Sequence, residues 1–165
     1  MLDYRENEII IIEKLKAYLS TEARPCEVVR QNQVAQIPPY PYVSYTLTSP
    51  MHEFGGTFSV APDGTRYRSA LQTWSFTVQS DDQEEALSLA YRIHDFFSVA
   101  GVTYLADNGI TVRRVRDIST RDNLITVQYE YRNGLDVTLG LLYTISADEL
   151  VTDDEIETAS ITRRE

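Results

Sequence analysis

The chain has 165 residues, 42% of them hydrophobic and 24% charged, which suffices for one globular domain with a real core. No apolar run approaches the roughly 20 residues of a membrane span, and a single cysteine, Cys26, excludes an internal disulfide and a cysteine-based zinc site. The net charge of −10 argues against gripping nucleic acid by phosphate neutralisation, which needs a basic patch.

Tyr4 to Ser20 carries apolar residues at three- and four-residue steps, which predicts an amphipathic helix. Asp3 is a possible N-cap, and Glu6, three residues later, could complete a capping box with it. Four consecutive isoleucines broaden the apolar stripe; we attribute this to the core, with a second contact surface as the alternative. The core residues predicted from this helix are Ile9, Ile12, Leu15 and Leu19.

The segment Pro38-Pro39-Tyr40-Pro41 lacks backbone donors at its three prolines and favours extended backbone. We interpret it as the entry to an edge strand over Tyr42–Thr48, with a proline-rich ligand motif as the alternative. Glu27 to Ile37, before it, is also expected to be extended. Ser49-Pro50 is expected to end the strand.

Ser49 to Thr65 is predicted to form a long irregular hairpin arm, because connections of this length in a compact domain are usually functional or mobile. Pro62-Asp63-Gly64 is a tight-turn signal within it. Phe54-Gly55-Gly56-Thr57 is rich in glycine but lacks the Lys-Ser/Thr pair and the strand-to-helix context of a phosphate loop. We therefore expect an arm that reaches a neighbour rather than a phosphate site.

Along Arg68 to Ser80, mainly apolar side chains alternate with polar ones, which predicts a second long strand. Its core face is expected to hold Trp74, Phe76 and Val78.

A helix is predicted to follow this strand and to run to Ala100, with Ser80 as its N-cap and Gln83 reaching back. Gly101 suits the position just past its end. The stripe of this helix adds Leu89, Ile93 and Phe97 to the expected core. Acidic residues at the helix start complement the helix dipole, so they do not call for a metal: Asp81, Asp82, Glu84 and Glu85.

Val102 to Leu105 and Ile110 to Ile118 are predicted to be two strands joined by a turn at Ala106-Asp107-Asn108-Gly109. The second strand carries a small basic spot, formed by Arg113, Arg114 and Arg116. It is too small to bind duplex DNA, and we expect a solvated edge or a contact with an acidic neighbour.

Leu124 to Ile145 contains two alternating runs around Asn133-Gly134, which predicts a β-hairpin. A three-residue loop, Arg132-Asn133-Gly134, places apolar residues opposite each other, whereas a two-residue loop pairs apolar with polar residues. We therefore expect a bulged turn with Gly134 left-handed, and Glu130 opposite Asp136. The core residues predicted from this hairpin are Val127, Tyr129, Val137 and Leu139.

These elements predict an α+β fold with a mainly antiparallel sheet, two helices packed on one face and the long hairpin arm. We assign residues 1–148 to a single domain and 149–165 to an acidic C-terminal tail or arm. His52 and His94 have no acidic or cysteine partner at ligand spacing, and nothing positions Asp107 or Asp136 beside a second carboxylate. We expect no catalytic residues, no metal site and no cofactor.

This layout resembles the neck and tail terminator proteins of long-tailed phages. The resemblance rests on Tyr-Glu-Tyr-Arg-Asn-Gly-Leu-Asp-Val-Thr-Leu at Tyr129–Leu139, on the helix-first order, on the proline-rich entry Pro38–Pro41 and on the helix after Ser80. It covers most of residues 4–145. After Asp136 the chain departs from the usual polar-aromatic pattern, with Val-Thr-Leu-Gly-Leu-Leu instead.

The resemblance implies a virion protein at the tail-neck junction, assembled in the host cytoplasm, with no enzymatic activity and no membrane contact. It implies a hexameric ring that caps the tail tube, stops its growth and offers a surface to the head. Expected partners are its own copies, the tail tube protein, the sheath where there is one, and connector or stopper proteins. DNA would pass through an acidic lumen without specific binding.

For the subunit or tube interface we predict residues of the arm and of the hairpin, whose polar side should face a neighbour or the lumen rather than the helices. These residues are Phe54, Phe58, Tyr67, Glu130, Arg132, Asn133 and Asp136. The alternative is a non-enzymatic adaptor module outside a ring, with a peptide groove near Pro38–Tyr45.

Overall fold

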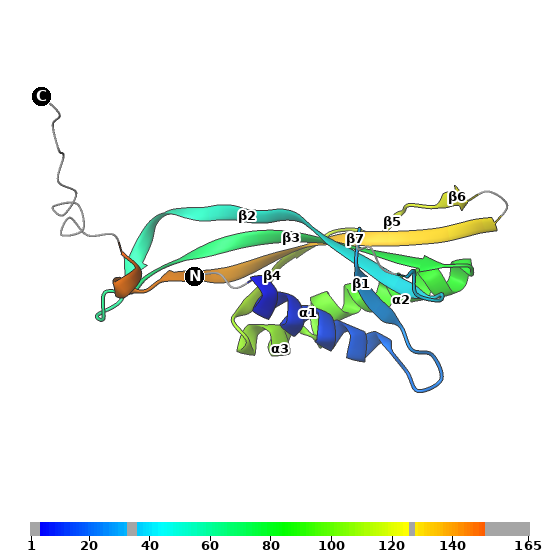
Figure 1. Ribbon diagram of the computed structural model, residues 1–165, viewed down its shortest axis with the longest axis horizontal. Coiled ribbons are helices and arrows are strands. Elements are labelled where there is room, and N and C mark those ends of the chain that lie inside the picture. The colour runs from blue at the N-terminus through cyan, green and yellow to red at the C-terminus, as the bar shows by residue number, and fades with distance from the viewer. Residues whose placement is uncertain (1–3, 33–35, 126–127, 151–165) are drawn as a thin grey trace, which may run out of the picture.

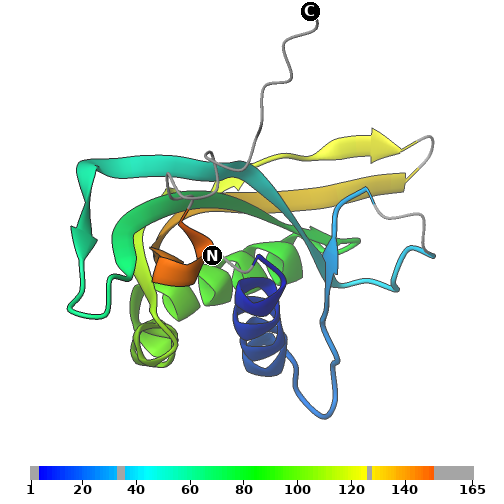
Figure 2. The same cartoon turned by 60° about the vertical axis from the view of Figure 1, so that its left-hand side comes forward.

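The computed structural model describes residues 4–32, 36–125 and 128–150, and side chains within these ranges except those of 53–56, 123–125 and 128–129. A long twisted sheet runs through the molecule, and the helices all lie against one of its faces (Figures 1 and 2). The predicted α+β class, with a mainly antiparallel sheet and helices on one face, is confirmed.

The sheet has seven strands: β1 (Glu27–Arg30), β2 (Tyr42–Val60), β3 (Arg66–Ser80), β4 (Ile110–Val115), β5 (Ser119–Thr120), β6 (Asn123–Ile125) and β7 (Gln128–Ile145). Their order is β1-β2-β3-β7-β4, with β5 and β6 also paired to β7. Only β1 and β2 pair in parallel. The helices are α1 (Tyr4–Leu19), α2 (Gln83–Asp95) with a π-helical turn η1 (Phe96–Ala100), and α3 (Val102–Asp107). A short 3-10 turn, η2 (Ala147–Glu149), follows β7.

The core lies between the helices and the middle of the sheet. Trp74, Phe76 and Val78 on β3 are fully buried, and their direct neighbours on β7 include Val137 and Leu135. The rings of Phe76 and Phe97 lie 5.1 Å apart, so η1 packs directly on β3. The other buried residues named above are Ile12, Leu15, Leu19, Leu89, Ile93, Phe97, Val137 and Leu139.

Ile9 is an exception, because 54% of its surface is exposed. Successive helix residues are rotated by about 100°, so four isoleucines in a row cannot share one face. Helix α1 turns Ile11 and Ile12 toward the sheet and leaves Ile9 outside. The prediction of Ile9 as a core residue was wrong.

The predicted turn at Arg132-Asn133-Gly134 was also wrong, because β7 runs straight through it. Asn133 pairs with Val78 and Gly134 with Thr77, inside one ladder that joins Ser80–Tyr131 to Arg66–Ile145. A turn there would have left the last four residues of β3, Thr77 to Ser80, without their partners on β7, so the long partner strand outweighs the local Asn-Gly signal. The hairpin instead joins β6 to β7, with Leu124 opposite Tyr129. Val127 lies outside the described residues, as does the Tyr129 side chain.

Ser49-Pro50 does not end β2, which continues with register shifts to Val60. From Thr46 onward β2 has no second neighbour among the described residues, whereas Tyr42–Tyr45 lies between β1 and β3. Pro50 is tolerated on this free edge, because a missing N–H there breaks no ladder bond. The expected edge strand is therefore present only beyond Tyr45.

The arm is longer and more regular than predicted. The ends of β2, β3 and β7 project together beyond the helices, with η2 beside the tip (Figure 1). The predicted turn closes the tip: Gly64 adopts a φ of +83° and its N–H donates to the Ala61 carbonyl at 2.9 Å.

Three further details differ from the sequence-based expectation. Val102 to Leu105, expected to be a strand, lies in helix α3, where Leu105 is buried against the core. The cap of α2 is Asp82, whose side chain accepts from the Glu85 N–H. Ser80 instead accepts from the Asp82 N–H and donates to the Glu85 carboxylate.

Candidate functional site

No group of three or more His, Cys, Asp or Glu side chains among the described residues could hold a metal ion. None of the described helices is both long enough and apolar enough to span a bilayer. Cys26 is buried, and burial raises the pKa of its thiol to about 11. Four surface features of the described residues are considered below.

The first is the sheet face that points away from the helices, here called the polar face. Gln79 and Ser44 are both buried there and are joined by a hydrogen bond of 2.8 Å from the amide of Gln79 to the Ser44 hydroxyl. Thr73 and Thr138 approach across β3 and β7, with their hydroxyl oxygens 3.4 Å apart. Small polar side chains thus cover this face of the sheet, whereas apolar side chains cover the face that packs against the helices.

Arg121 is the hub of the polar face. Its guanidinium donates to the hydroxyls of Ser75 and Thr77, both at 2.9 Å, and to the Asp136 carboxylate at 3.2 Å. Gly134 makes room for it: a Cβ there would lie 2.8 Å from the Arg121 guanidinium and 2.7 Å from the Phe76 carbonyl oxygen. The Asn-Gly pair therefore serves close packing rather than a turn.

Three more arginines follow at the edge of the sheet, two on β4 and one directly after it. Arg113 lies across Gly140, where a Cβ would sit 2.8 Å from its guanidine nitrogen. Arg114 pairs with Thr138, so it shares the polar face, and Arg116 lies next to Asp136, whose carbonyl accepts its N–H at 2.8 Å. We call Arg113, Arg114, Arg116 and Arg121 the arginine stripe. A cavity of about 280 Å³ opens among the last three and Asp136.

The second feature pins the proline-rich segment to the start of β7. Glu130 is only 4% exposed and accepts hydrogen bonds from the Tyr40 hydroxyl at 2.7 Å and from Arg132. The bond to Glu130, with help from burial, raises the pKa of Tyr40 to about 12. The rings of Tyr40 and Tyr42 stack at 5.8 Å. A groove of about 240 Å³ lies beside this segment, lined in part by Ile37, Pro38 and Arg132.

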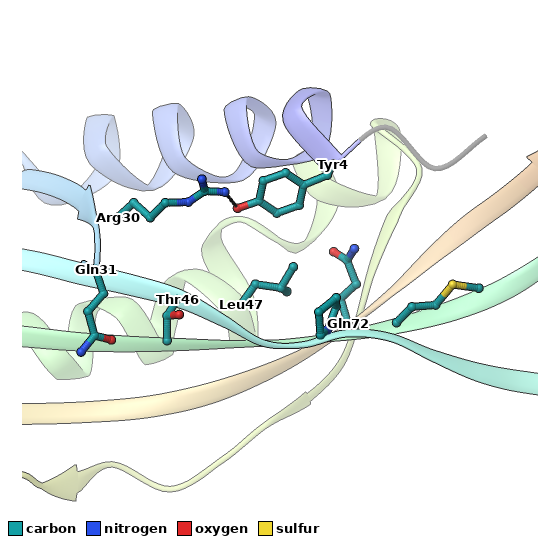
Figure 3. A pocket seen from close by; sticks show the side chains of 8 residues that line it. Tyr4, Arg30, Gln31, Thr46, Leu47 and Gln72 are labelled. Carbon is teal, nitrogen blue, oxygen red and sulfur yellow. Dashed lines mark hydrogen bonds between the residues drawn. The ribbon is translucent and has the colours of Figure 1, made fainter. Parts of the chain in front are cut away.

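The third feature is a cavity of about 490 Å³ between the start of α1 and the free edge of β2 (Figure 3). Tyr4 from α1 and Arg30 from the end of β1 meet at its wall, and Leu47 and Gln72 line it (Figure 3). Glu8 holds this wall, because it accepts from the hydroxyls of Tyr45 at 2.6 Å and Tyr4 at 3.0 Å.

The contacts around Glu8 tie α1 to β1 and β2. The Tyr4 ring also stacks on Trp74 at 5.8 Å. Burial, followed by the hydrogen bond to Glu8, raises the pKa of Tyr45, so this hydroxyl stays a donor. The wall of the cavity thus consists of groups whose bonds hold α1 in place, and we interpret it as a structural joint.

The fourth feature is the arm. The Arg68 guanidinium lies over the Phe58 ring at 4.3 Å and over the Tyr143 ring at 5.8 Å, which locks one side of the arm. Apolar side chains remain exposed elsewhere on it: Met51, Val60, Tyr67 and Leu142. Leu142 and Val60 are 57% and 64% exposed.

The predicted interface residues separate into two groups. Arg132 and Asp136 lie on the polar face with Glu130, which is itself buried, and Phe58 and Tyr67 lie on the arm. Asn133 lies apart from both groups: it pairs with Val78, lies on the helix side of the sheet and is 6% exposed. The side chain of Phe54 lies outside the described residues.

Sequence reasoning missed Arg121 and Tyr40 as centres of contact. Arg121 lies in a short loop with no periodic signal, and its partners are distant in sequence. Gly134 and Gly140, an even number of residues apart in one strand, were the available clue, because a strand glycine often marks a close approach by other groups.

Residues 10–164 match the family described as phage neck terminator protein. No curated protein matches the chain.

Proposed function

Because the chain belongs to the phage neck terminator family, whose members are structural proteins of the phage neck, we propose that it forms a hexameric ring. The ring caps the tail tube, ends tube polymerisation and offers a joining surface to the head. Its partners are its own copies, the tail tube protein, a sheath where the tail has one, and connector or stopper proteins. Assembly takes place in the host cytoplasm, and DNA passes through the lumen without specific binding.

The projecting arm is the observation that carries this proposal. No helix layer of the described residues covers either face of its three strands, and exposed Val60, Tyr67 and Leu142 lie on it. Apolar groups on a projecting element mark surfaces that a partner covers. A stable interface buries roughly 800 Å² per partner, which is more than one strand edge supplies. The arm offers a second set of side chains for such a contact.

We propose that the arm and the polar face together form the contacts between subunits or with the tube. Phe58 and Tyr67 act from the arm, and Arg132 and Asp136 act from the polar face. Residues 1–148 form one domain, and residues 149–165 are its acidic C-terminal tail.

Two experiments test the ring. Native mass spectrometry of the purified protein should show six copies, or a monomer that becomes a hexamer once tail tubes are added. Negative-stain images of virions lacking this protein should show tails of abnormal length. Tails of normal length without the protein would contradict the proposal.

A second candidate is an adaptor module outside a ring, favoured by the groove beside the proline-rich segment. The groove has apolar walls from Ile37 and Pro38 and a cationic group from Arg132. A pulldown that returns one soluble host protein and no tail component would support this candidate over the ring.

A further inference from the structure

The two faces of the arm differ in how their large side chains are used. The ladder between β3 and β7 runs from Arg66–Ile145 to Ser80–Tyr131 without a register shift, so side chains alternate strictly between the faces. On the face that continues the helix side of the sheet, the Arg68 guanidinium lies over the rings of Phe58 and Tyr143. These two rings therefore already have a partner within one copy.

Three apolar side chains gather on the other face, which continues the polar face into the arm. Tyr67 and Leu71 lie on it, because each is an even number of residues from Thr73 on β3. Leu142 lies on it as well, because it is paired with Ser69. Tyr67 and Leu142 are exposed and Leu71 is half-buried. We call Tyr67, Leu71 and Leu142 the arm strip.

A positive charge borders the arm strip. Arg113 lies across Gly140, and Gly140 is paired with Leu71. The Arg113 side chain is exposed and forms no ion pair with the described residues. Asp136, the nearest acid on this face of β7, is roughly 20 Å from Leu142 along the strand at ~3.3 Å per residue. The arm strip is thus an apolar surface with a positive border.

The outer surface of α2 carries the complementary pattern. Leu87 and Tyr91 are adjacent on the helix because they are four residues apart, and they are 37% and 55% exposed. Exposed Val99 on η1 extends them, and we call these three residues the helix row. Glu84 and Asp95 flank the helix row, and both are exposed. Neither acid forms an ion pair with a described Lys or Arg residue, so the border of this row is negative.

We propose that the arm strip of one copy packs on the helix row of a second copy, with Arg113 against the acids that flank the row. Opposite charges at the two borders favour this pairing and oppose the pairing of two strips or two rows. Because the two surfaces differ, the contact is heterologous, and heterologous contacts generate closed rings when the rotation between copies allows it. The inference deepens the proposed ring and rests on it.

One copy cannot make this contact with itself. The helices pack on one face of the sheet and the arm strip lies on the other, so the sheet separates the two surfaces (Figures 1 and 2). The strip belongs to the continuous strands β3 and β7, and the row belongs to α2 and η1. Each copy can therefore offer its strip to one neighbour and its row to another.

Other exposed apolar residues of the described chain fit the arm strip less well. Ile37 borders the groove that Arg132 lines, and this cation would repel Arg113. Ile9 on α1 has acids at the same spacing as the helix row, Glu6 and Glu13, but it is a single exposed side chain rather than a row. The helix row thus combines apolar area with the required charge.

Cysteine cross-linking on tail tubes tests the contact. One variant carries Leu142→Cys and another carries Tyr91→Cys, and the native Cys26 is buried and does not compete. The two variants are mixed with tail tubes and treated with a short bismaleimide. The mixture should give a cross-linked dimer that contains one copy of each variant, whereas either variant alone should give none.

Matched controls come from the other face of the arm and from α1. Val60→Cys takes the place of Leu142→Cys, because Val60 is 64% exposed but its pairing with Arg66 puts it on the helix side of the arm. Ile9→Cys takes the place of Tyr91→Cys, because Ile9 is 54% exposed on the neighbouring helix. Neither control should give the dimer.

Charge reversal tests the borders. Arg113→Glu should weaken subunit association about 10-fold, and adding Glu84→Lys and Asp95→Lys to the same chain should restore it to within about threefold. Arg5→Glu, which reverses an exposed arginine on α1, should leave association within about twofold. Sedimentation velocity measures association, or co-sedimentation with tail tubes if the protein alone is monomeric. An Arg113→Glu protein that associates like the wild type would contradict the proposal.

The cross-linking outcomes separate this contact from the ring. A dimer of two Leu142→Cys copies, with none that joins Leu142→Cys to Tyr91→Cys, overturns the contact in favour of a symmetric one. A cross-link from Leu142→Cys to the tail tube protein alone, or no cross-link at all, also overturns it. In each of these cases the ring stands if six copies are still counted. Cross-linked chains of unequal length that do not close at six support the contact and overturn the ring.

Discussion

The body and the arm are built from the same three strands but differ in what covers them. In the body, β2, β3 and β7 lie under the helices, and Trp74, Phe76 and Val137 are fully buried. In the arm the same strands continue beyond the helices that the structure describes, and Tyr67 and Leu142 are 37% and 57% exposed. Hydrogen bonds between the strands are present in both the body and the arm, so they do not explain the stability of the body. Side-chain burial does, and the arm must obtain it from another molecule.

The largest effect should come from the body. Phe76→Ala removes a fully buried ring that packs 5.1 Å from Phe97. We expect it to lower the free energy of unfolding by about 3–5 kcal/mol, the usual result for such a truncation. Urea denaturation followed by circular dichroism measures it. A loss below about 1 kcal/mol would mean that the helix layer does not stabilise the body as described.

Two glycines of β7 give a matched pair for the packing of the polar face. In Gly134→Ala the new Cβ meets the Phe76 carbonyl oxygen, a backbone atom, and we expect a loss of about 1–3 kcal/mol. In Gly140→Ala it meets the end of the Arg113 side chain, which can move, so the change should stay within about 0.5 kcal/mol. Equal effects in urea denaturation would show that Arg121 and Phe76 do not restrict Gly134.

The contact between Tyr40 and Glu130 should appear as a pH dependence. The pKa of Tyr40 is raised from its ordinary value near 10 to about 12, so the folded state holds this proton more tightly than the unfolded chain. Its contribution to stability is present below pH 10 and is lost as the pH rises through about 12. Urea midpoints across this range should fall less steeply for Tyr40→Phe than for the wild type. Parallel curves would count against the contact.

The smallest effect on folding should come from the arm. Tyr67→Ser removes a partly exposed ring, so we expect the free energy of unfolding of the monomer to change by no more than about 0.5 kcal/mol. Subunit association should nevertheless weaken, because aromatic side chains contribute strongly to interfaces. Sedimentation velocity and urea denaturation on the same sample separate the two. A large loss of monomer stability with intact association would reverse the assignment of body and arm.

Elements whose apolar residues recur at a regular spacing were predictable from the sequence. The helix over Tyr4–Leu19, the strand that buries Trp74, and the helix after Asp82 all have one apolar face that must meet a core. Their existence follows from hydrophobic spacing alone. The tight turn at Gly64 was predictable for a different reason, since its residues favour the backbone angles that the turn needs.

The errors arose where distant partners outweigh local signals. Asn133-Gly134 suggests a turn, but fifteen residues of β3 hold β7 straight through it. Val102 and its β-branched neighbour Thr103 favour a strand, but packing of Leu105 holds them in a helix. The arginine stripe was visible as a basic spot, yet its hub at Arg121 depends on contacts to Ser75, Thr77 and Asp136 that no local pattern contains.

The central claim is that uncovered strands of the arm are completed by neighbouring copies in a closed ring. Chemical cross-linking of the protein on tail tubes, followed by mass measurement, tests this most directly. The account predicts a ladder of cross-linked species that ends at six times the 18.8 kDa chain mass. A ladder that stops at one or two chains would contradict it.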